Sequence, residues 1–152
     1  MTYDAIIVGA SITGLYIGKH LASHGARVLI VDRRSAIGSP VRCGQATGNR
    51  AELARFVEID ERWIACDLAG LSVHCCNRVW QRPIGDTGVI LDRLKFEQSL
   101  ADNARRAGAE VRLTTPVIGL VEGGECFSGV RLDSGETMHG RFIVGADGPE
   151  SS

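Results

Sequence analysis

The first 34 residues constrain the fold of this chain more than any other part. An apolar run at 3–8 leads into a turn at 9–14 that begins and ends with glycine. A helical stretch follows to about residue 24, and a second apolar run at 27–31 ends immediately before Asp32. Strand, tight turn, helix, strand and acid, in this order, form the unit that binds the ADP half of a dinucleotide.

The turn departs from the usual GxGxxG pattern because Ser11 stands where the middle glycine is expected. That glycine lets the backbone approach the pyrophosphate, so the Cβ of Ser11 crowds this space while its hydroxyl could donate to a phosphate oxygen. The helix after Gly14 still offers free N–H groups and a positive dipole end to phosphates. Asp32, 18 residues beyond Gly14, can accept hydrogen bonds from the ribose hydroxyls. The alternative is a plain strand–helix turn followed by a solvated acid.

Composition narrows the class of protein. A chain of 152 residues is long enough for one domain with its own core. The 17 Lys and Arg are balanced by 18 Asp and Glu, which argues against a nucleic-acid-binding surface. The apolar runs are far shorter than the roughly 20 residues that span a bilayer, so we expect no membrane span. Peripheral association with a membrane surface stays possible.

Cysteine usage indicates a reducing compartment. The five cysteines are Cys43, Cys66, Cys75, Cys76 and Cys126, an odd number without a CxxC pair or a zinc-type spacing. No secretory signal precedes the first strand, so we expect reduced thiols, a cytoplasmic location and no metal site. Taken alone, Cys43 is expected to be a buried small residue, and Cys75 and Cys76 are expected to pack in a core.

The stretch from Arg33 to Asn49 is polar, rich in turn residues and without periodicity, which predicts a long loop. Within it, Arg42 precedes Cys43, and a neighbouring cation can lower the pKa of a thiol. Cys43 is therefore the single candidate for a catalytic residue in this sequence.

The middle of the chain predicts short elements. A short helix is expected at 51–57 and a helix from the N-cap Asp92 to a stop at Gly108. The expected strands lie at 71–76, 78–81, 89–91 and 110–113, with turns at 82–83 and 85–86.

The last third predicts a three-stranded meander followed by one further strand. The meander strands are expected at 116–121, 126–132 and 136–139. A separate apolar strand at 141–146 then ends in Asp147-Gly148, and residues 142–146 are expected to be an unprotected sheet edge.

Together these segments resemble the N-terminal part of the geranylgeranyl reductase family, FAD-dependent enzymes of the p-hydroxybenzoate-hydroxylase-like flavoprotein group. The most specific match is the loop at 37–45, which is close to the family's Gly-Ser-Pro-Val-Arg-Cys-Gly-Glu segment. The other matches are Tyr3 to Ala10 with Gly14, Val89 to Arg93 with Phe96, Leu100 and 108–111, and Gly145 to Gly148 with Glu150-Ser151.

The resemblance implies a Rossmann-like α/β FAD-binding domain of the glutathione-reductase type, with a parallel sheet, crossing helices and a three-stranded β-meander. It also implies FAD bound in an extended form. By position, the implied cofactor-binding residues are Gly9, Ser11, Thr13, Gly14, Asp32, Arg33, Cys43, Gly44, Ala46, Arg93, Val117 and Asp147.

Individual roles follow from the same resemblance. Gly14 would face the pyrophosphate, Asp32 the adenosine ribose and Arg33 the adenine, to which Val117 would offer its backbone. Cys43, Gly44 and Ala46 would lie in the loop along the flavin side. Arg93 would reach the cofactor, and Asp147 would support the dinucleotide motif.

The implied chemistry is hydride transfer from reduced FAD to an isolated carbon–carbon double bond of a prenyl chain, carried by a small molecule or a lipid. The electron donor, NAD(P)H or ferredoxin, and the oligomeric state stay open. Ser11 and Gln45-Ala46 depart from the family pattern, and family members continue well beyond residue 152. We therefore expect residues 1–152 to form a truncated FAD-binding domain with little turnover of its own. An FAD-dependent monooxygenase or halogenase and an inactive dinucleotide-binding fragment are the alternatives.

Overall fold

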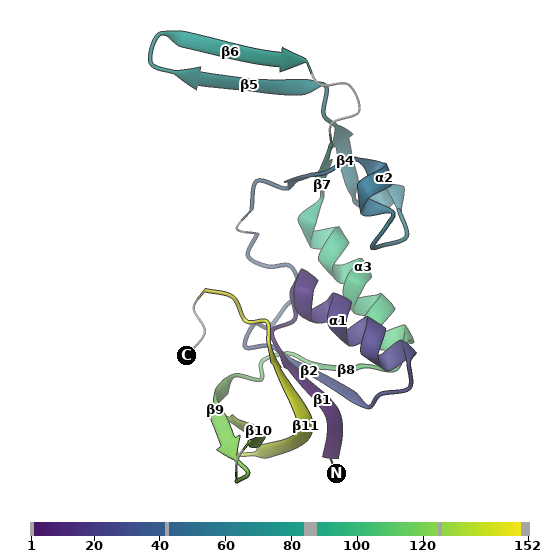
Figure 1. The fold of residues 1–152 in the computed structure, drawn as a ribbon, viewed down its shortest axis with the longest axis vertical. Coiled ribbons are helices and arrows are strands. Elements are labelled where there is room, and N and C mark those ends of the chain that lie inside the picture. Colours follow the sequence, from purple (N-terminus) through teal and green to yellow (C-terminus); the bar gives the residue numbers. More distant parts are fainter. Residues whose placement is uncertain (1, 42, 84–87, 125, 150–152) are drawn as a thin grey trace. The chain divides into compact units, whose positions relative to one another are not determined.

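The computed structural model describes residues 2–41, 43–83, 88–124 and 126–149, and the chain forms two compact units. Unit 1 comprises residues 1–39 and 97–152, and unit 2 comprises residues 40–96. The division falls within the helix α3 (Arg93–Arg106), which is drawn in green in Figure 1.

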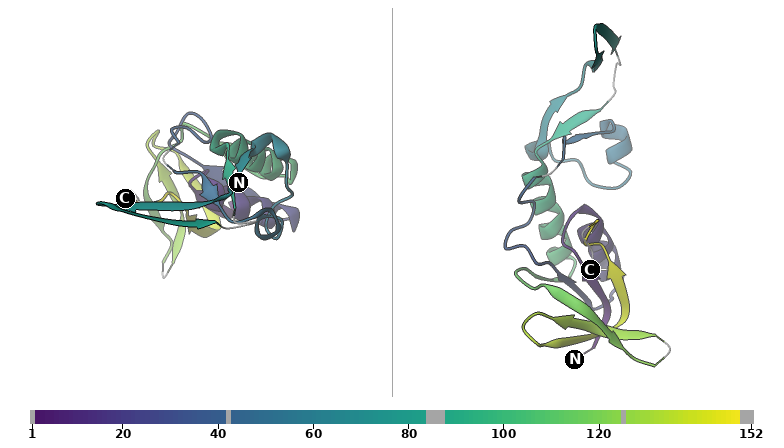
Figure 2. Two further views of the ribbon diagram at one scale, coloured as in Figure 1. Left: turned by 90° about the horizontal axis from the view of Figure 1, so that it is seen from above. Right: turned by 90° about the vertical axis from the view of Figure 1, so that its left-hand side faces the viewer.

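Unit 1 is built on a six-stranded sheet in the order β8-β2-β1-β11-β10-β9. Its strands are β1 (Thr2–Val8), β2 (Val28–Val31), β8 (Glu110–Arg112), β9 (Val117–Glu122), β10 (Phe127–Leu132) and β11 (Thr137–Gly145). The pairs β8–β2, β2–β1 and β1–β11 are parallel, whereas β10 is antiparallel to both β11 and β9 (Figures 1 and 2). This arrangement confirms the predicted α/β fold with a mostly parallel sheet and a meander.

Successive side chains of β1 and β2 point to opposite faces of the sheet, and both faces are covered. Ile7 and Ile30 lie beneath α1 (Ile12–Ser23), so close that a Cβ on Gly18 would lie 2.4 Å from Ile30 Cδ1. The neighbouring side chains, Ile6 and Leu29, belong instead to a buried cluster with residues of the meander. Because both faces of these strands are covered, a continuous apolar run is needed rather than an alternating one.

The second of these apolar layers is formed by the parallel strands and the meander. Its buried members are Tyr3, Ile6, Leu29, Val31, Val130, Leu132 and Met138. The meander thus completes the core of unit 1 on one face of the parallel strands, and α1 covers the other.

The predicted strands at 136–139 and 141–146 are one continuous strand, β11, so their separation was wrong. Gly140 continues the strand by pairing with Tyr3 of β1, and a Cβ at this position would lie 2.9 Å from Ile6 Cγ1 on the same neighbouring strand. The first three residues of β11 pair with β10, and β11 pairs with β1 from His139 to Gly145. Beyond His139, the described residues of β11 show pairing with β1 and none with β10.

Unit 2 contains two small antiparallel sheets. One has the order β3-β7-β4, with β3 (Ala46–Thr47), β7 (Val89–Leu91) and β4 (Ile64–Asp67). The other is the hairpin of β5 (Gly70–Cys75) and β6 (Arg78–Pro83). The indole of Trp63 is buried and meets the ring of Phe96 edge-on at a centroid distance of 4.8 Å, which forms a small core.

Several predicted boundaries in unit 2 need correction. The short helix α2 is Arg50–Leu53, held at its start by a capping box between Asn49 and Glu52. Residues 82–83 lie in β6, paired with Leu71 and Gly70, rather than in a turn, because Pro83 stands at the end of a strand, where a missing N–H is tolerated. The predicted turn at 85–86 lies outside the described residues.

The N-cap of α3 is confirmed. The Lys95 N–H donates to Asp92 Oδ1 at 3.2 Å, and the Lys95 ammonium lies 2.8 Å from Asp92 Oδ2. These contacts with Lys95 lower the pKa of Asp92.

The cysteines correct a second expectation. Cys43, Cys75 and Cys76 are exposed rather than buried, and Cys66 and Cys126 are exposed and free as well. Every residue of β5 is exposed, so Cys75 packs in no core of unit 2. Among the described residues, none of the helices combines the length and the apolarity that crossing a membrane requires.

Candidate functional site

The turn between β1 and α1 is tied to the end of β2 by two short hydrogen bonds from its backbone N–H groups. The Gly9 N–H donates to the carbonyl of Val31 at 2.7 Å, and the Ala10 N–H donates to Asp32 Oδ2 at 2.7 Å. The second bond holds the acid beside the glycine turn. The two parts of the sequence pattern that predicted a dinucleotide site therefore meet in space.

Both glycines of the turn are required by the backbone itself. Gly9 has φ +112°, and a Cβ there would lie 2.3 Å from the Ala146 carbonyl oxygen. A Cβ on Gly14 would lie 1.9 Å from the Gly9 carbonyl oxygen. The first turn of α1 therefore lies directly against the loop, and no side chain fits between them.

The N-terminus of α1 is suited to an anion. Ser11 is the N-cap residue, but its side chain makes no capping hydrogen bond, and the first turn carries no acidic residue. The N–H groups at the start of a helix and the positive end of its dipole bind phosphate when no side chain caps them. The first turn of α1 can therefore present its N–H groups to a phosphate, whereas the N–H groups of Gly9 and Ala10 are used within the chain.

The Ser11 hydroxyl instead donates to Glu97 Oε1 at 3.1 Å. Glu97 belongs to α3 and is 3% exposed. Such a donor stabilises a buried carboxylate. Replacing Ser11 with glycine would therefore remove a hydrogen bond to Glu97. The sequence prediction for Ser11 considered only crowding and a phosphate contact, and this third role was missed.

We expect Ser11→Ala and Ser11→Gly to lower the free energy of unfolding by about 1–3 kcal/mol, because each leaves the Glu97 carboxylate without this donor. The two variants should differ in cofactor binding, since only Ser11→Gly removes the Cβ that is predicted to crowd the pyrophosphate. Urea denaturation and a titration with FAD measure the two effects. Equal FAD affinity in the two variants would contradict the crowding argument.

Asp32 is 7% exposed, and its carboxylate is surrounded by donors. Besides the Ala10 N–H, it accepts the Arg34 N–H on Oδ1 at 2.8 Å, Arg34 Nε on Oδ1 at 3.0 Å and Arg34 Nη2 on Oδ2 at 2.9 Å. Burial works to raise the pKa of Asp32, but these hydrogen bonds and the charge of Arg34 outweigh it, and the pKa is lowered. Asp32 in turn raises the pKa of Arg34.

The other predicted residues of unit 1 lie near the same turn or in adjoining loops. Thr13 is exposed on the first turn of α1, and Arg33 is exposed beside Asp32. The Asp147 N atom lies 2.8 Å from the position of a Cβ on Gly9. Val117 begins β9, two residues after Thr115, whose N–H donates to the Asp32 carbonyl at 2.8 Å. Their contacts with a cofactor stay predictions.

The remaining predicted residues lie in unit 2: Cys43 and Gly44 precede β3, Ala46 begins β3, and Arg93 follows β7. The Gln45 carbonyl accepts the Leu91 N–H at 2.9 Å, and Ala46 pairs with Ile90. Cys43 Sγ accepts the Gln45 N–H at 3.4 Å. Arg93 is the first residue of α3. Arg42, which was predicted to act on the Cys43 thiol, lies outside the described residues, so the catalytic role of Cys43 stays a prediction.

Gly44 differs from the glycines of the turn. A Cβ at this position would meet no atom within 4 Å, and its φ lies outside the left-handed region. The described chain itself therefore gives no reason for a glycine here.

Two residues of this site were not found from the sequence: Arg34 and Glu97. The sequence shows Arg33-Arg34 after the acid but does not tell which guanidinium folds back onto it. Glu97 stands five residues after the N-cap of α3, and only the packing of α3 beside the turn reveals its partner.

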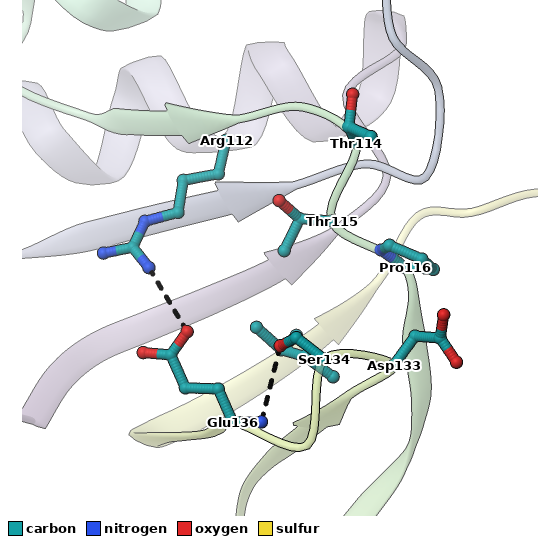
Figure 3. Close-up of a pocket in the computed structure, with 8 residues that line it drawn as sticks. Arg112, Thr114, Thr115, Pro116, Asp133, Ser134 and Glu136 are labelled. Carbon is teal, nitrogen blue, oxygen red and sulfur yellow. Dashed lines mark hydrogen bonds and ion pairs between the residues drawn. The ribbon is translucent and has the colours of Figure 1, made fainter.

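A separate surface pocket of about 440 Å³ lies in unit 1 beside the turn that joins β10 and β11 (Figure 3). Its lining residues are Arg112, Thr114, Thr115, Pro116, Leu132, Asp133, Ser134 and Glu136. None of the predicted cofactor-binding residues lines it. Among the described residues, no group of three or more His, Cys, Asp or Glu side chains is placed to hold a metal ion.

Comparison with known proteins identifies the family. Residues 2–152 match the family model described as FAD binding domain. A digeranylgeranylglycerophospholipid reductase of Methanosarcina acetivorans is 36% identical over 98% of this chain and 38% of its own length. A reductase of the same name from Methanocella arvoryzae is also 36% identical, over 98% of this chain and 40% of its own length. The chain thus spans about two fifths of these relatives.

Solved structures agree with this result. A geranylgeranyl bacteriochlorophyll reductase-like protein of Thermoplasma acidophilum superposes with a TM-score of 0.85 at 27% identity, over 97% of this chain and 39% of its own. The halogenase PltM, solved with phloroglucinol and FAD, has a TM-score of 0.73 at 20% identity, over 95% of this chain and 34% of its own. The first likeness confirms the resemblance to geranylgeranyl reductases, and the second concerns the fold alone.

Proposed function

The chain belongs to the family of FAD binding domains, and from this premise we propose that unit 1 holds the ADP half of FAD. We further propose that residues 1–152 serve as the FAD-binding domain of a reductase that acts on prenyl double bonds. The similarity to digeranylgeranylglycerophospholipid reductases over 98% of the chain supports the second step.

The residues present fit FAD at the β1–α1 turn. The uncapped N-terminus of α1 would receive the pyrophosphate, with Thr13 and Gly14 in its first turn. Asp32 would accept the ribose hydroxyls, with Arg33 beside it for the adenine. The single observation that carries this proposal is the hydrogen bond from the Ala10 N–H to Asp32, because it fixes the acid next to the phosphate-binding turn.

Bound FAD would supply hydride transfer, and the chain's own residues would position it. In unit 2 we propose that Cys43, Gly44 and Ala46 lie along the flavin and that Arg93 reaches the cofactor. The pairing of Ala46 with Ile90 and the hydrogen bond from Leu91 to the Gln45 carbonyl support this role for the loop, because a loop held by backbone hydrogen bonds positions a ligand better than a free one. We assign no proton-transfer role to Cys43 here.

The proposed substrate class is a prenyl chain on a lipid or small molecule, because the relatives named above are reductases of a digeranylgeranyl phospholipid. The likeness to halogenases does not favour halogenation, since identities near 20% support only a common fold.

The test uses the product of the open reading frame that encodes residues 1–152, because the chain spans 38% of the reductase from Methanosarcina acetivorans. The protein is loaded with FAD, reduced with dithionite without oxygen and mixed with a digeranylgeranyl phospholipid. We expect reoxidation of the flavin together with a product that has gained two hydrogen atoms per reduced double bond. A flavin that is reduced but never reoxidised by prenyl lipids would count against the reductase, and the absence of bound flavin would count against the cofactor.

Gly44→Ala provides a test of the loop. We expect this variant to keep the wild-type free energy of unfolding within about 0.5 kcal/mol, because the added Cβ meets open space. We expect weaker FAD binding, since the methyl group would occupy the space proposed for the flavin. Thermal unfolding of the apoprotein and an FAD titration measure both quantities, and unchanged FAD affinity would remove Gly44 from the site.

A further inference from the structure

The Asp32 carboxylate is saturated by donors from its own chain. An ionised carboxylate offers about four lone-pair positions, two on each oxygen. Oδ1 accepts the Arg34 N–H and Arg34 Nε, and Oδ2 accepts the Ala10 N–H and Arg34 Nη2. Two of these four donors belong to the side chain of Arg34, and two belong to the backbone.

A ribose needs two of the same positions, one for each hydroxyl. The side chain of Arg34 therefore occupies the acceptor sites that the adenosine ribose would use. The guanidinium also donates through Nη2 to the Ala10 carbonyl at 3.2 Å, so it bridges the acid and the glycine turn. Its side chain is 28% exposed, which leaves it a path towards solvent.

We propose that Arg34 is a latch on the ribose site: its guanidinium covers the Asp32 carboxylate and must swing away before a ribose can bind. This inference rests on the proposed FAD site. Arg34 acts through Asp32 and is a positioning residue rather than a catalytic one. It holds the acid ionised and oriented until the ribose hydroxyls take its place.

The variant Arg34→Ala removes the guanidinium and leaves the Asp32 carboxylate in place. In Arg34→Ala the two backbone donors remain, so the Ala10 and Arg34 N–H groups still orient the carboxylate. The two positions that the guanidinium filled become available to ligand hydroxyls. Binding no longer requires breaking the side-chain pair, and the fraction of molecules competent to bind increases.

The sign of the expected effect is diagnostic. FAD and ADP are anions, so the loss of a positive charge at this place should weaken their binding by long-range electrostatics. A latch predicts the opposite result. We expect Arg34→Ala to bind FAD about tenfold more tightly, mainly through faster association, and Arg34→Lys to show a smaller gain because an ammonium makes no forked contact.

The test measures FAD association by stopped-flow fluorescence and nucleotide affinity by calorimetry. Arg141→Ala is the matched control, because it removes an exposed guanidinium from the same unit, 3.6 Å from Asp4, and should give no gain. ADP and 2′,3′-dideoxy-ADP separate the ribose from the phosphates. The gain in Arg34→Ala should appear with ADP and vanish with the dideoxy ligand.

Weaker FAD binding in Arg34→Ala, or an equal gain for ADP and dideoxy-ADP, would overturn the latch and leave the proposed function intact. Failure of the wild type and of both Arg34 variants to bind FAD and ADP would overturn the latch and the proposed function together. Thermal unfolding of each protein without FAD shows whether the variants are folded. If Arg34→Ala does not fold, Arg34→Lys carries the test.

Discussion

Replacing Gly14 with alanine is expected to destabilise the protein by about 4 kcal/mol or more, which is a large part of the stability of a typical domain. The added Cβ would lie 1.9 Å from the Gly9 carbonyl oxygen and 3.3 Å from Ile7 Cγ2. Neither the backbone oxygen nor the buried strand can move without opening the contact between α1 and the sheet. Circular dichroism and urea denaturation measure the loss.

Gly145→Ala is the matched control for this prediction. In the same unit, a Cβ on Gly145 would meet its nearest atom, Asp147 Oδ1, at an ordinary distance of 3.7 Å. We expect this variant to unfold at nearly the same urea concentration as the wild type. Equal stability of the Gly14 and Gly145 variants would show that the close approach of α1 to the turn is not required for folding.

Replacing Asp32 with asparagine is expected to weaken FAD binding about 100-fold. The two charge-assisted hydrogen bonds that we propose between Asp32 and the ribose would become neutral, and the amide nitrogen can only donate. The amide also faces donors from Ala10 and Arg34, so the turn itself loses stability. Asp102→Asn, at an exposed carboxylate on α3 of the same unit, is the control and should leave FAD affinity unchanged. Comparable affinities in the two variants would exclude Asp32 from the cofactor site.

The lowered pKa of Asp32 also predicts how the free energy of unfolding changes at acidic pH. The pKa of Asp32 is lower in the folded protein than in the unfolded one. Asp32 therefore stabilises the fold at a pH above its pKa in the unfolded protein, and this contribution is lost as the pH falls through its pKa in the folded protein. The free energy of unfolding of the Asp32→Asn protein should therefore decrease less at acidic pH than that of the wild type. The comparison is made by measuring the unfolding free energy of both proteins from neutral to acidic pH.

The parts of the fold that sequence predicted correctly are those set by local pattern. The strand–turn–helix–strand unit follows from apolar runs and glycine spacing, and the N-cap Asp92 follows from the start of a helical period. The continuity of β11 was missed because it depends on Gly140 lying against Ile6, which is 134 residues away in the sequence. The two-residue strand β3 has no pattern of its own and exists through its pairing with β7.

The candidate site shows the same division. Gly9, Gly14 and Asp32 were found because spacing along the chain marks them, and the structure places them together through Ala10. The pattern does not show which arginine covers Asp32, because Arg33 and Arg34 are adjacent and differ only in the direction of their side chains. The burial of Cys43 was predicted from residue preference alone, and its exposure follows from the loop in which it lies.

The most direct test of the central claim is a titration of residues 1–152 with FAD, FMN and ADP. The claim is that this chain recognises the cofactor through its ADP half, at the β1–α1 turn and Asp32. We therefore expect FAD to bind, ADP to displace it competitively, and FMN, which lacks the adenosine monophosphate moiety, to bind far more weakly. Binding of FMN with the same affinity as FAD, or failure of ADP to compete, would contradict the account.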